Sequence, residues 1–333
     1  MYTRLKGMLK PKNNVITTKL QERLNLKRPS ARAYASLIRR LFNETKQTGD
    51  LNLRFLDSDR VVTHLKSIAN VGTRKNLASA ALAGARAAKM SQARQNSIRV
   101  VMMSADADYK RFMSSGSRNK GFTGKAAVLW KELRNLHKKV GRVITAKQIF
   151  RRAQHPFEDI QTLQFFVYCK LLHFYEPRRL EYSSLRFLTP GKLALFTQAE
   201  QNKLNYVLMG TKKWKLVYNN YKTSRTYGSQ SYDIPPGLKT TLRKVHAIFE
   251  PLVPAGWVYF TKNKRPMSHS TFSKFLKTMF KTYTGKNWTQ NVVRSIRVSA
   301  LFKDAPATQQ LLKTQKDMGS KLETLALNYR VPQ

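Results

Sequence analysis

The sequence predicts a mainly helical α+β protein that carries a small antiparallel sheet and is divided into two domains. Apolar residues recur at helical spacing over the first 140 or so residues. Short segments rich in Val, Tyr and Trp, which are typical of strands, occur only in the second half. The chain of 333 residues is long enough for two domains, and its 41% of hydrophobic residues can form a sizeable core.

The first half is expected to be a basic helical domain preceded by an arm. Residues 1–26 are basic and weakly periodic, which indicates an arm or a loosely held helix. Apolar residues of one helical face, and alanine-rich or amphipathic stretches, predict helices in the part that follows. These helices are expected over residues 30–42, from about residue 57, and over residues 73–89, 104–113 and 125–139. We therefore assign residues 27–140 to a helical domain.

The second half, residues 141–333, is expected to be the α+β domain, with the boundary near residues 139–145. The segments that read as strands are short and rich in Val, Tyr and Trp, and helical segments lie on both sides of them. Strands are expected over residues 214–218, 230–234 and 257–260, and helices over residues 161–175, 270–283, 290–302 and 309–317.

The chain carries a large excess of positive charge. Its 62 Lys and Arg residues against 18 Asp and Glu residues give a formal net charge of +44, and the basic residues are spread along the whole sequence. This favours a folded surface that binds a polyanion over a single basic tail. A membrane is the other large anionic surface, but no apolar run approaches the roughly 20 residues that span a bilayer. The N-terminus lacks the apolar stretch of a signal peptide, so an intracellular location is expected.

Cysteine, histidine and acidic residues exclude several classes of site. Cys169 is the single cysteine, so an internal disulfide is excluded, and its apolar surroundings predict a core residue. The six histidines are scattered without metal-ligand spacing, and no carboxylate pattern of a two-metal nuclease is visible. Residues 116–125 lack the ending of an ATPase phosphate loop. We therefore expect no metal site and no ATPase.

Four short motifs, far apart in the sequence, each hold one residue suited to phosphodiester chemistry. These residues are Arg178 in PRRLE, Lys222 in YKT, Arg294 in NVVRS, and Tyr329 after the MGS turn. DNA can be cut and rejoined without an energy source when the protein forms a covalent intermediate, for which a tyrosine is a suitable nucleophile. The planar fork of arginine matches phosphate oxygens, and a positioned lysine can protonate the leaving oxygen.

The order and spacing of these motifs resemble the catalytic domain of the tyrosine recombinases, close to the integrase-like recombinases of large DNA viruses and virophages. The resemblance covers residues 27–333, because the segments RPSARAYASLIRRLF and TRKNLASAALA resemble the family's core-binding domain. It implies a site-specific recombinase or integrase that works on double-stranded DNA through a 3′-phosphotyrosyl intermediate. It also implies a C-shaped clamp of two domains around the duplex, with a dimer on one site and a tetramer in synapsis. It implies that no cofactor is needed.

The resemblance implies a role for each residue. Arg178, which precedes Glu181 with the family's spacing, and Arg294 bind the phosphate, Lys222 is the general acid, and Tyr329 is the nucleophile. Two alternatives stay open: Arg179 could take the role of Arg178 by a one-residue slip, and Arg225 could take the role of Lys222.

Two positions depart from the family's pattern. Asn291 stands three residues before Arg294, where the family has His or Lys, and Ser320 follows Gly319, where the family has His or Trp. Both can line the site and form hydrogen bonds, but neither can act as an imidazole base.

Further cations are expected to bind DNA phosphates, which makes the affinity depend steeply on salt. They are Arg32, Arg39, Arg40, Arg74, Lys75, Arg225 and Arg297. Two other functions stay open. A type IB topoisomerase has similar chemistry but relaxes DNA of any sequence. A degenerate recombinase could serve as a DNA-binding or packaging protein, which the departures at Asn291 and Ser320 would favour.

Overall fold

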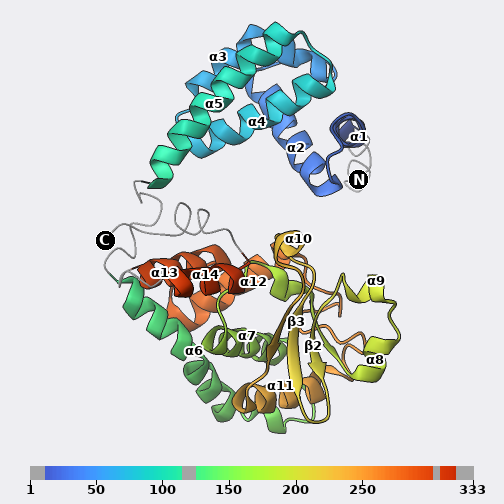
Figure 1. Ribbon diagram of the computed structural model, residues 1–333, viewed down its shortest axis with the longest axis vertical. Coiled ribbons are helices and arrows are strands. Elements are labelled where there is room, and N and C mark those ends of the chain that lie inside the picture. Colours follow the sequence, from blue (N-terminus) through green and yellow to red (C-terminus); the bar gives the residue numbers. More distant parts are fainter. Residues whose placement is uncertain (1–11, 115–124, 303–307, 320–333) are drawn as a thin grey trace, which may run out of the picture. The chain divides into compact units, whose positions relative to one another are not determined.

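The computed structural model describes residues 12–114, 125–302 and 308–319, and the chain divides into two compact units (Figure 1). Unit 1 comprises Met1–Arg118 and unit 2 comprises Asn119–Gln333. Each unit has a hydrophobic core of its own. The clamp that the resemblance implies stays a prediction.

Unit 1 is helical over its described residues. Its helices are α1 (Lys12–Leu24), α2 (Arg28–Glu44), α3 (Asp59–Ser67), α4 (Val71–Ala87) and α5 (Gln92–Ser114). The alanine-rich helix α4 packs against α1, α2, α3 and α5, and its alanines at 78, 80, 81, 85 and 87 are buried. Their small side chains let the neighbouring helices approach closely. A Cβ atom at Gly84 of the same helix would lie 2.6 Å from Cδ1 of Leu56.

For residues 1–26 the sequence allows an arm or a loosely held helix, and the part that the structure describes is a helix and not an arm. Helix α1 packs against α2 and α4, and its Ile16 and Leu20 are buried in the core of unit 1. Only a few apolar side chains hold this helix, which explains why its periodicity is weak in the sequence. Residues 1–11 lie outside the described residues.

Unit 2 combines helices with a four-stranded sheet. Its strands are β1 (Leu185–Leu188), β2 (Asn205–Met209), β3 (Trp214–Tyr218) and β4 (Gln230–Asp233). Its described helices are α6 (Ala126–Ala146), α7 (Phe157–Phe174), α8 (Pro190–Ala194), α9 (Gln198–Gln201), α10 (Ser224–Tyr227), α11 (Pro236–Phe249), α12 (His269–Thr284), α13 (Gln290–Phe302) and α14 (Thr308–Asp317). Most residues of α7 are buried on all sides, as expected for a helix at the centre of a core. Figure 1 shows α7 between α6 and the sheet.

The division between the units falls after Arg118 and not near residue 140, where the sequence places the boundary. Helix α6 carries Leu129, Leu133, Leu136 and Val140 at helical spacing, and all four are buried. This apolar stripe packs against α7 and α13. Because the stripe is buried by helices of unit 2, α6 belongs to that unit.

The sheet is mixed and not antiparallel as predicted. Its order is β1-β2-β3-β4, in which β1 pairs with β2 in parallel and the other two pairs are antiparallel. Parallel pairing needs a crossover connection, and the segment that contains α8 and α9 provides it. β3 and β4 lie where they are expected. The third predicted strand is wrong, because Trp257 and Phe260 pair with two different segments through isolated bridges.

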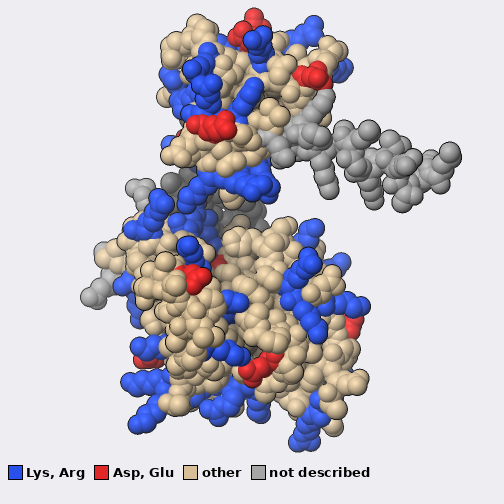
Figure 2. Space-filling view, turned by 90° about the vertical axis from the view of Figure 1, so that its right-hand side faces the viewer, with Lys and Arg blue, Asp and Glu red and all other residues tan. Residues whose placement is uncertain are grey.

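The basic residues are spread over the surface of both units. On the face drawn in Figure 2, Lys and Arg side chains lie over each unit, and Asp and Glu side chains are few. No helix of the described residues has the length and apolar character needed to cross a membrane.

Candidate functional site

Four segments that are distant in the sequence meet in unit 2. They are the residues that follow α7, the connection between β3 and β4, the first turns of α13, and the end of α14. Arg178, Arg294 and Gly319 come from three of these segments, and Lys222 comes from the fourth. Tyr329 and Ser320 lie outside the described residues.

Arg178 lies in a cage of aromatic rings. Its side chain is 2% exposed, and its guanidinium carbon lies 4.4, 5.0 and 5.9 Å from the ring centroids of Tyr218, Tyr221 and Tyr232. Aromatic faces attract a cation without carrying a net charge. Burial raises the pKa of Tyr218 well above its usual range and that of Tyr232 to about 12. These phenols therefore stay neutral, and Arg178 keeps its full positive charge.

The hydrogen bonds of the Arg178 guanidinium go to neutral partners. Nη2 donates to Oε1 of Gln230 and, over 3.0 Å, to the hydroxyl of Tyr232. Nη1 is buried and has no hydrogen-bond partner among the described residues. It faces Gly319, where an added Cβ atom would lie 3.2 Å away. A buried donor without an acceptor costs about 1–3 kcal/mol, so an anion that reached Nη1 would remove that cost.

Helix α13 fixes the backbone around Arg178. Arg294 is 0% exposed and donates from Nη1 to the carbonyl oxygens of Pro177 and Met318 over 3.2 and 3.1 Å. Gln290 donates from Nε2 to the carbonyl oxygen of Arg178, and its Oε1 accepts a hydrogen bond from Tyr168. Sequence reasoning missed Gln290, although it directly precedes Asn291.

Gly319 closes the site at the end of α14. Its φ of +58° lies in the left-handed region, which favours glycine. A Cβ atom at this position would lie 3.2 Å from Cδ2 of Tyr221 as well as from Arg178. The carbonyl oxygen of Gly319 accepts a hydrogen bond from the hydroxyl of Thr223 over 2.8 Å. The backbone conformation therefore favours glycine in this turn, and a side chain here would press on Arg178 and Tyr221.

Lys222 and Asn291 lie at the border of the site with exposed side chains. Lys222 stands between Tyr221 and Thr223, which both contact the site. The expected hairpin is a longer connection that includes α10. The side chain of Asn291 forms no hydrogen bond with any residue that the structure describes.

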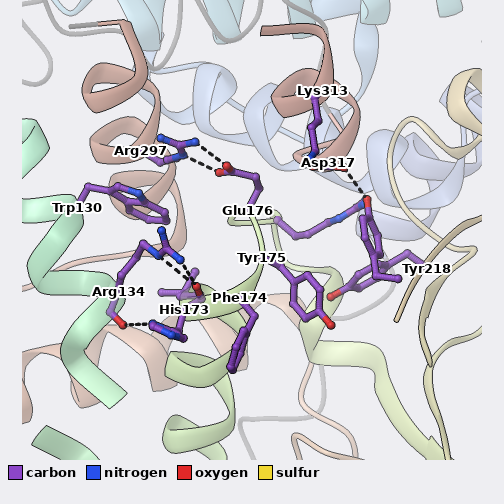
Figure 3. Close-up of a pocket in the computed structure, with 13 residues that line it drawn as sticks. Trp130, Arg134, His173, Phe174, Tyr175, Glu176, Tyr218, Arg297, Lys313 and Asp317 are labelled. Atoms are coloured by element: carbon purple, nitrogen blue, oxygen red, sulfur yellow. Dashed lines mark hydrogen bonds and ion pairs between the residues drawn. The ribbon is translucent and has the colours of Figure 1, made fainter. Parts of the chain in front are cut away.

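A pocket of about 360 Å³ opens beside Arg178 (Figure 3). Trp130 and Arg134 of α6 line one side of it, and Lys313 and Asp317 of α14 line another. Burial raises the pKa of the Asp317 carboxyl, which accepts a hydrogen bond from the Tyr232 hydroxyl over 3.1 Å. Sequence reasoning missed Asp317, because nothing in the sequence shows that it lies near Arg178.

Arg297 lines the same pocket, but a carboxylate holds it. Its Nε and Nη2 donate to the two carboxylate oxygens of Glu176 over 2.7 and 2.6 Å (Figure 3), and its guanidinium lies 5.3 Å from the ring of Trp130. The bidentate pair occupies the donors that a phosphate contact would use.

The other cations that were expected to bind DNA fall into two groups. Arg32, Arg39 and Arg225 form no ion pair with any described residue. The remaining three pair with carboxylates of unit 1: Arg40 with Glu44, Arg74 with Asp108 and Lys75 with Asp106, over 2.6, 2.6 and 2.5 Å.

Helix α12 carries a row of exposed lysines that sequence reasoning missed. Lys274, Lys277 and Lys281 recur at spacings of three and four, which places them on one face of the helix. None of the three forms an ion pair within the part of the chain that the structure describes. The sequence does indicate a cationic surface here, because it contains no acidic residue between Glu250 and Asp304. We call these three residues the lysine row.

The predicted core position of Cys169 is confirmed. Its side chain is fully buried in α7, and burial raises the pKa of the thiol well above its usual value. Over residues 12–114, 125–302 and 308–319, no three or more His, Cys, Asp or Glu side chains are grouped so that they could hold a metal ion.

Comparisons with known proteins give distant similarity to solved structures and none to family models or curated proteins. Among solved structures, the crystal structure of XerA recombinase aligns with 96% of this chain and 95% of that chain, at 9% sequence identity and a TM-score of 0.35. A TM-score this low does not establish a common fold.

Proposed function

We propose that this chain is a tyrosine recombinase or integrase that cuts and rejoins double-stranded DNA at specific sites. The observation that carries the proposal is the meeting of Arg178 and Arg294 beside Gly319, with Nη1 of Arg178 free of partners among the described residues. Buried guanidinium groups held by neutral partners make a strongly positive site of low dielectric. Such a site suits a phosphate whose charge increases in the transition state.

In the proposed reaction, the phenolic oxygen of Tyr329 attacks the phosphorus, releases its proton to solvent and forms a 3′-phosphotyrosyl bond. The bond from phosphorus to the 5′ oxygen breaks, and Lys222 donates a proton to the leaving oxygen. Arg178 stabilises the non-bridging oxygens through Nη1, and Arg294 adds positive charge from α13. Attack of a 5′ hydroxyl on the phosphotyrosyl bond then rejoins DNA without an external energy source.

The length of the C-terminal segment is compatible with this role for Tyr329. Tyr329 follows Gly319 by ten residues (329 − 319 = 10). An extended chain spans at most about 3.3–3.6 Å per residue, or about 35 Å in total. Because Gly319 adjoins Arg178, the segment is long enough to bring the phenol to the arginine pair of the same protomer or to that of a neighbouring one.

Cations that form no ion pair with the described residues would hold the DNA. The lysine row and three arginines, Arg32, Arg39 and Arg225, are available to contact phosphates. Each such contact releases counterions from the DNA. Recombination joins two DNA sites, so we propose a dimer on each site and a tetramer in synapsis. Asn291 and Ser320 are proposed to hydrogen-bond at the border of the site and not to act as bases.

A nicked suicide duplex that carries the DNA flanking the gene tests the proposal. The short strand beyond the nick is lost after cleavage, which traps the covalent complex. We expect a protein–DNA adduct with the wild-type chain and none with Tyr329→Phe. Tyr34→Phe, which removes a hydroxyl in α2 of unit 1, is the matched control and should form the adduct at the wild-type rate.

Two other results would contradict the proposal. DNA binding without an adduct on any flanking duplex would favour a DNA-binding or packaging protein. Relaxation of supercoiled plasmid of any sequence, lost in Tyr329→Phe, would favour a type IB topoisomerase.

A further inference from the structure

A half-buried carboxyl lies two hydrogen bonds from the proposed phosphate-binding arginine. Asp317, the last residue of α14, lines the pocket beside Arg178 (Figure 3). Its Oδ1 lies 3.1 Å from the hydroxyl of Tyr232, which in turn lies 3.0 Å from Nη2 of Arg178. One hydroxyl group therefore connects α14 to the guanidinium.

The Tyr232 hydroxyl has one proton and two acceptors within reach. Oε1 of Gln230 lies 2.9 Å from this hydroxyl and also accepts from Nη2 of Arg178. The orientation of the Gln230 amide is fixed, because its Nε2 donates to the carbonyl oxygen of Lys316 over 3.0 Å. A carboxylate is a stronger acceptor than an amide oxygen, so ionised Asp317 accepts the hydrogen bond that the Tyr232 hydroxyl donates. The lone pairs of Tyr232 and Gln230 are then both available to Arg178.

The hydroxyl between Asp317 and Arg178 has a second effect. A carboxylate in direct contact would neutralise the guanidinium and occupy its donors, as Glu176 does to Arg297. Asp317 instead orients Arg178 from a distance and leaves Nη1 on the side of Gly319 without a partner. Burial raises the pKa of Asp317, so keeping this carboxyl ionised opposes folding, which is typical of residues retained for function.

The geometry points to Asp317 as a positioning residue that holds Arg178, through Tyr232, with Nη2 engaged and Nη1 presented to a phosphate. This inference rests on the proposed phosphate-binding role of Arg178. The same residue lies next to Met318, whose carbonyl oxygen accepts from Arg294. Asp317 therefore also ties the start of the segment that leads to Tyr329 to both arginines.

A double-mutant cycle in DNA binding tests the inference without requiring catalysis. The probe is a nicked 30-base-pair duplex, and the dissociation constant is measured for the wild type, Asp317→Leu, Arg178→Gln and the double variant. We expect Arg178→Gln to weaken binding about tenfold and Asp317→Leu to weaken it about fivefold, which is the range of single charged and neutral hydrogen bonds. The double variant should bind no more weakly than Arg178→Gln alone, because Asp317 acts only through the arginine.

Three further variants separate positioning from structural support. Asp317→Asn keeps an acceptor for Tyr232, but an amide oxygen is weaker than a carboxylate, so this variant should restore part of the affinity. Tyr232→Phe removes the connecting hydroxyl, so Asp317→Leu should not weaken binding further in that background. This second cycle does not use Arg178→Gln and can be read even if that variant fails to fold. Asp233→Asn, which removes an exposed carboxylate at the end of β4, controls for net charge and should not weaken binding. Thermal unfolding of Asp317→Leu should occur at or above the wild-type temperature.

Additive losses in both cycles, or no loss in Asp317→Leu, would overturn the inference. So would a lower unfolding temperature of Asp317→Leu together with a failure of Asp317→Asn to restore binding. Absence of a covalent adduct with the wild-type chain would instead contradict the proposed recombinase activity, and the binding cycles would still be readable.

Discussion

Arg178 and Arg297 line the same pocket but have opposite kinds of partners. Arg178 is held by aromatic faces, an amide oxygen and a phenol, which are all neutral. Arg297 is held by both oxygens of the Glu176 carboxylate. The first arrangement keeps the positive charge available to a ligand, whereas the second satisfies it inside the protein. The partner of a buried cation, and not its place in the sequence, therefore decides whether it can bind a phosphate.

The same contrast separates two cations of α4 from the lysine row of α12. Arg74 and Lys75 pair with Asp108 and Asp106 in unit 1, whereas the lysine row of α12 lies in a stretch of sequence that contains no acidic residue. Unpaired cations on one helix face repel one another, which weakens folding unless a polyanion neutralises them. We therefore expect substitutions in the two kinds of cation to separate function from stability.

The largest difference is expected between Arg178→Ala and Arg297→Ala. Loss of a donor to the transition-state oxygens typically lowers the rate about 100- to 1,000-fold, so Arg178→Ala should reduce adduct formation by that range. Arg297→Ala should change the rate less than about tenfold, but should lower the unfolding temperature because Glu176 loses its partner. Adduct kinetics on the suicide duplex and thermal denaturation measure the two effects. Equal rate losses in both variants would show that the Glu176 carboxylate does not keep Arg297 from binding the phosphate.

Arg294 should contribute more to stability than any surface arginine. Arg294→Leu leaves the carbonyl oxygens of Pro177 and Met318 without this donor, at a cost of roughly 2–4 kcal/mol. Arg40→Leu, which breaks an exposed ion pair with Glu44, should change the free energy of unfolding by less than about 1 kcal/mol. Urea unfolding of both variants provides the measurement. A small effect of Arg294→Leu would mean that α13 does not fix the backbone around Arg178.

Replacing the lysine row with glutamine should flatten the salt dependence of DNA binding. Each lost phosphate contact lowers the slope of log affinity against log salt by about 0.9, so three contacts give a change of about 2.7. The double substitution of Arg74 and Lys75 by glutamine should leave the slope nearly unchanged, because Asp108 and Asp106 already neutralise these cations. Binding titrations between about 50 and 200 mM salt compare the two variants. Equal slopes would show that α12 does not contact the DNA.

The smallest effect is expected at an imidazole that burial keeps neutral. Burial, with Lys170, His173 and Lys138 nearby, lowers the pKa of His137 to about 4. Because this pKa lies below that of the unfolded chain, near 6.5, His137 opposes folding increasingly as the pH falls from about 6.5 towards 4.

His137→Phe should therefore reduce the loss of unfolding temperature of the wild type between pH 7 and pH 4.5. The exposed His269 serves as the control, and His269→Gln should leave that loss unchanged. If His269→Gln reduced the loss of unfolding temperature more than His137→Phe did, burial would not be what keeps His137 neutral.

The sequence by itself determined the elements that depend on local patterns. Helical spacing predicted α2, α12 and α13, strand composition predicted β3 and β4, and the motifs singled out Arg178 and Arg294. It also predicted a glycine turn at Gly319, whose positive φ the structure confirms. These features follow from the side-chain periodicity and the conformational freedom of the residues themselves.

Only the tertiary structure decided which residues act as partners. The parallel pairing of β1 with β2, the place of α6 in unit 2 and the packing of α1 depend on contacts across long stretches of chain. So do the pairing of Arg297 with Glu176 and the hydrogen bond between Asp317 and Tyr232 near Arg178. The physical reason is that periodicity shows which face of an element is apolar, but not which distant face will cover it. The charge that remains on each arginine depends on that choice.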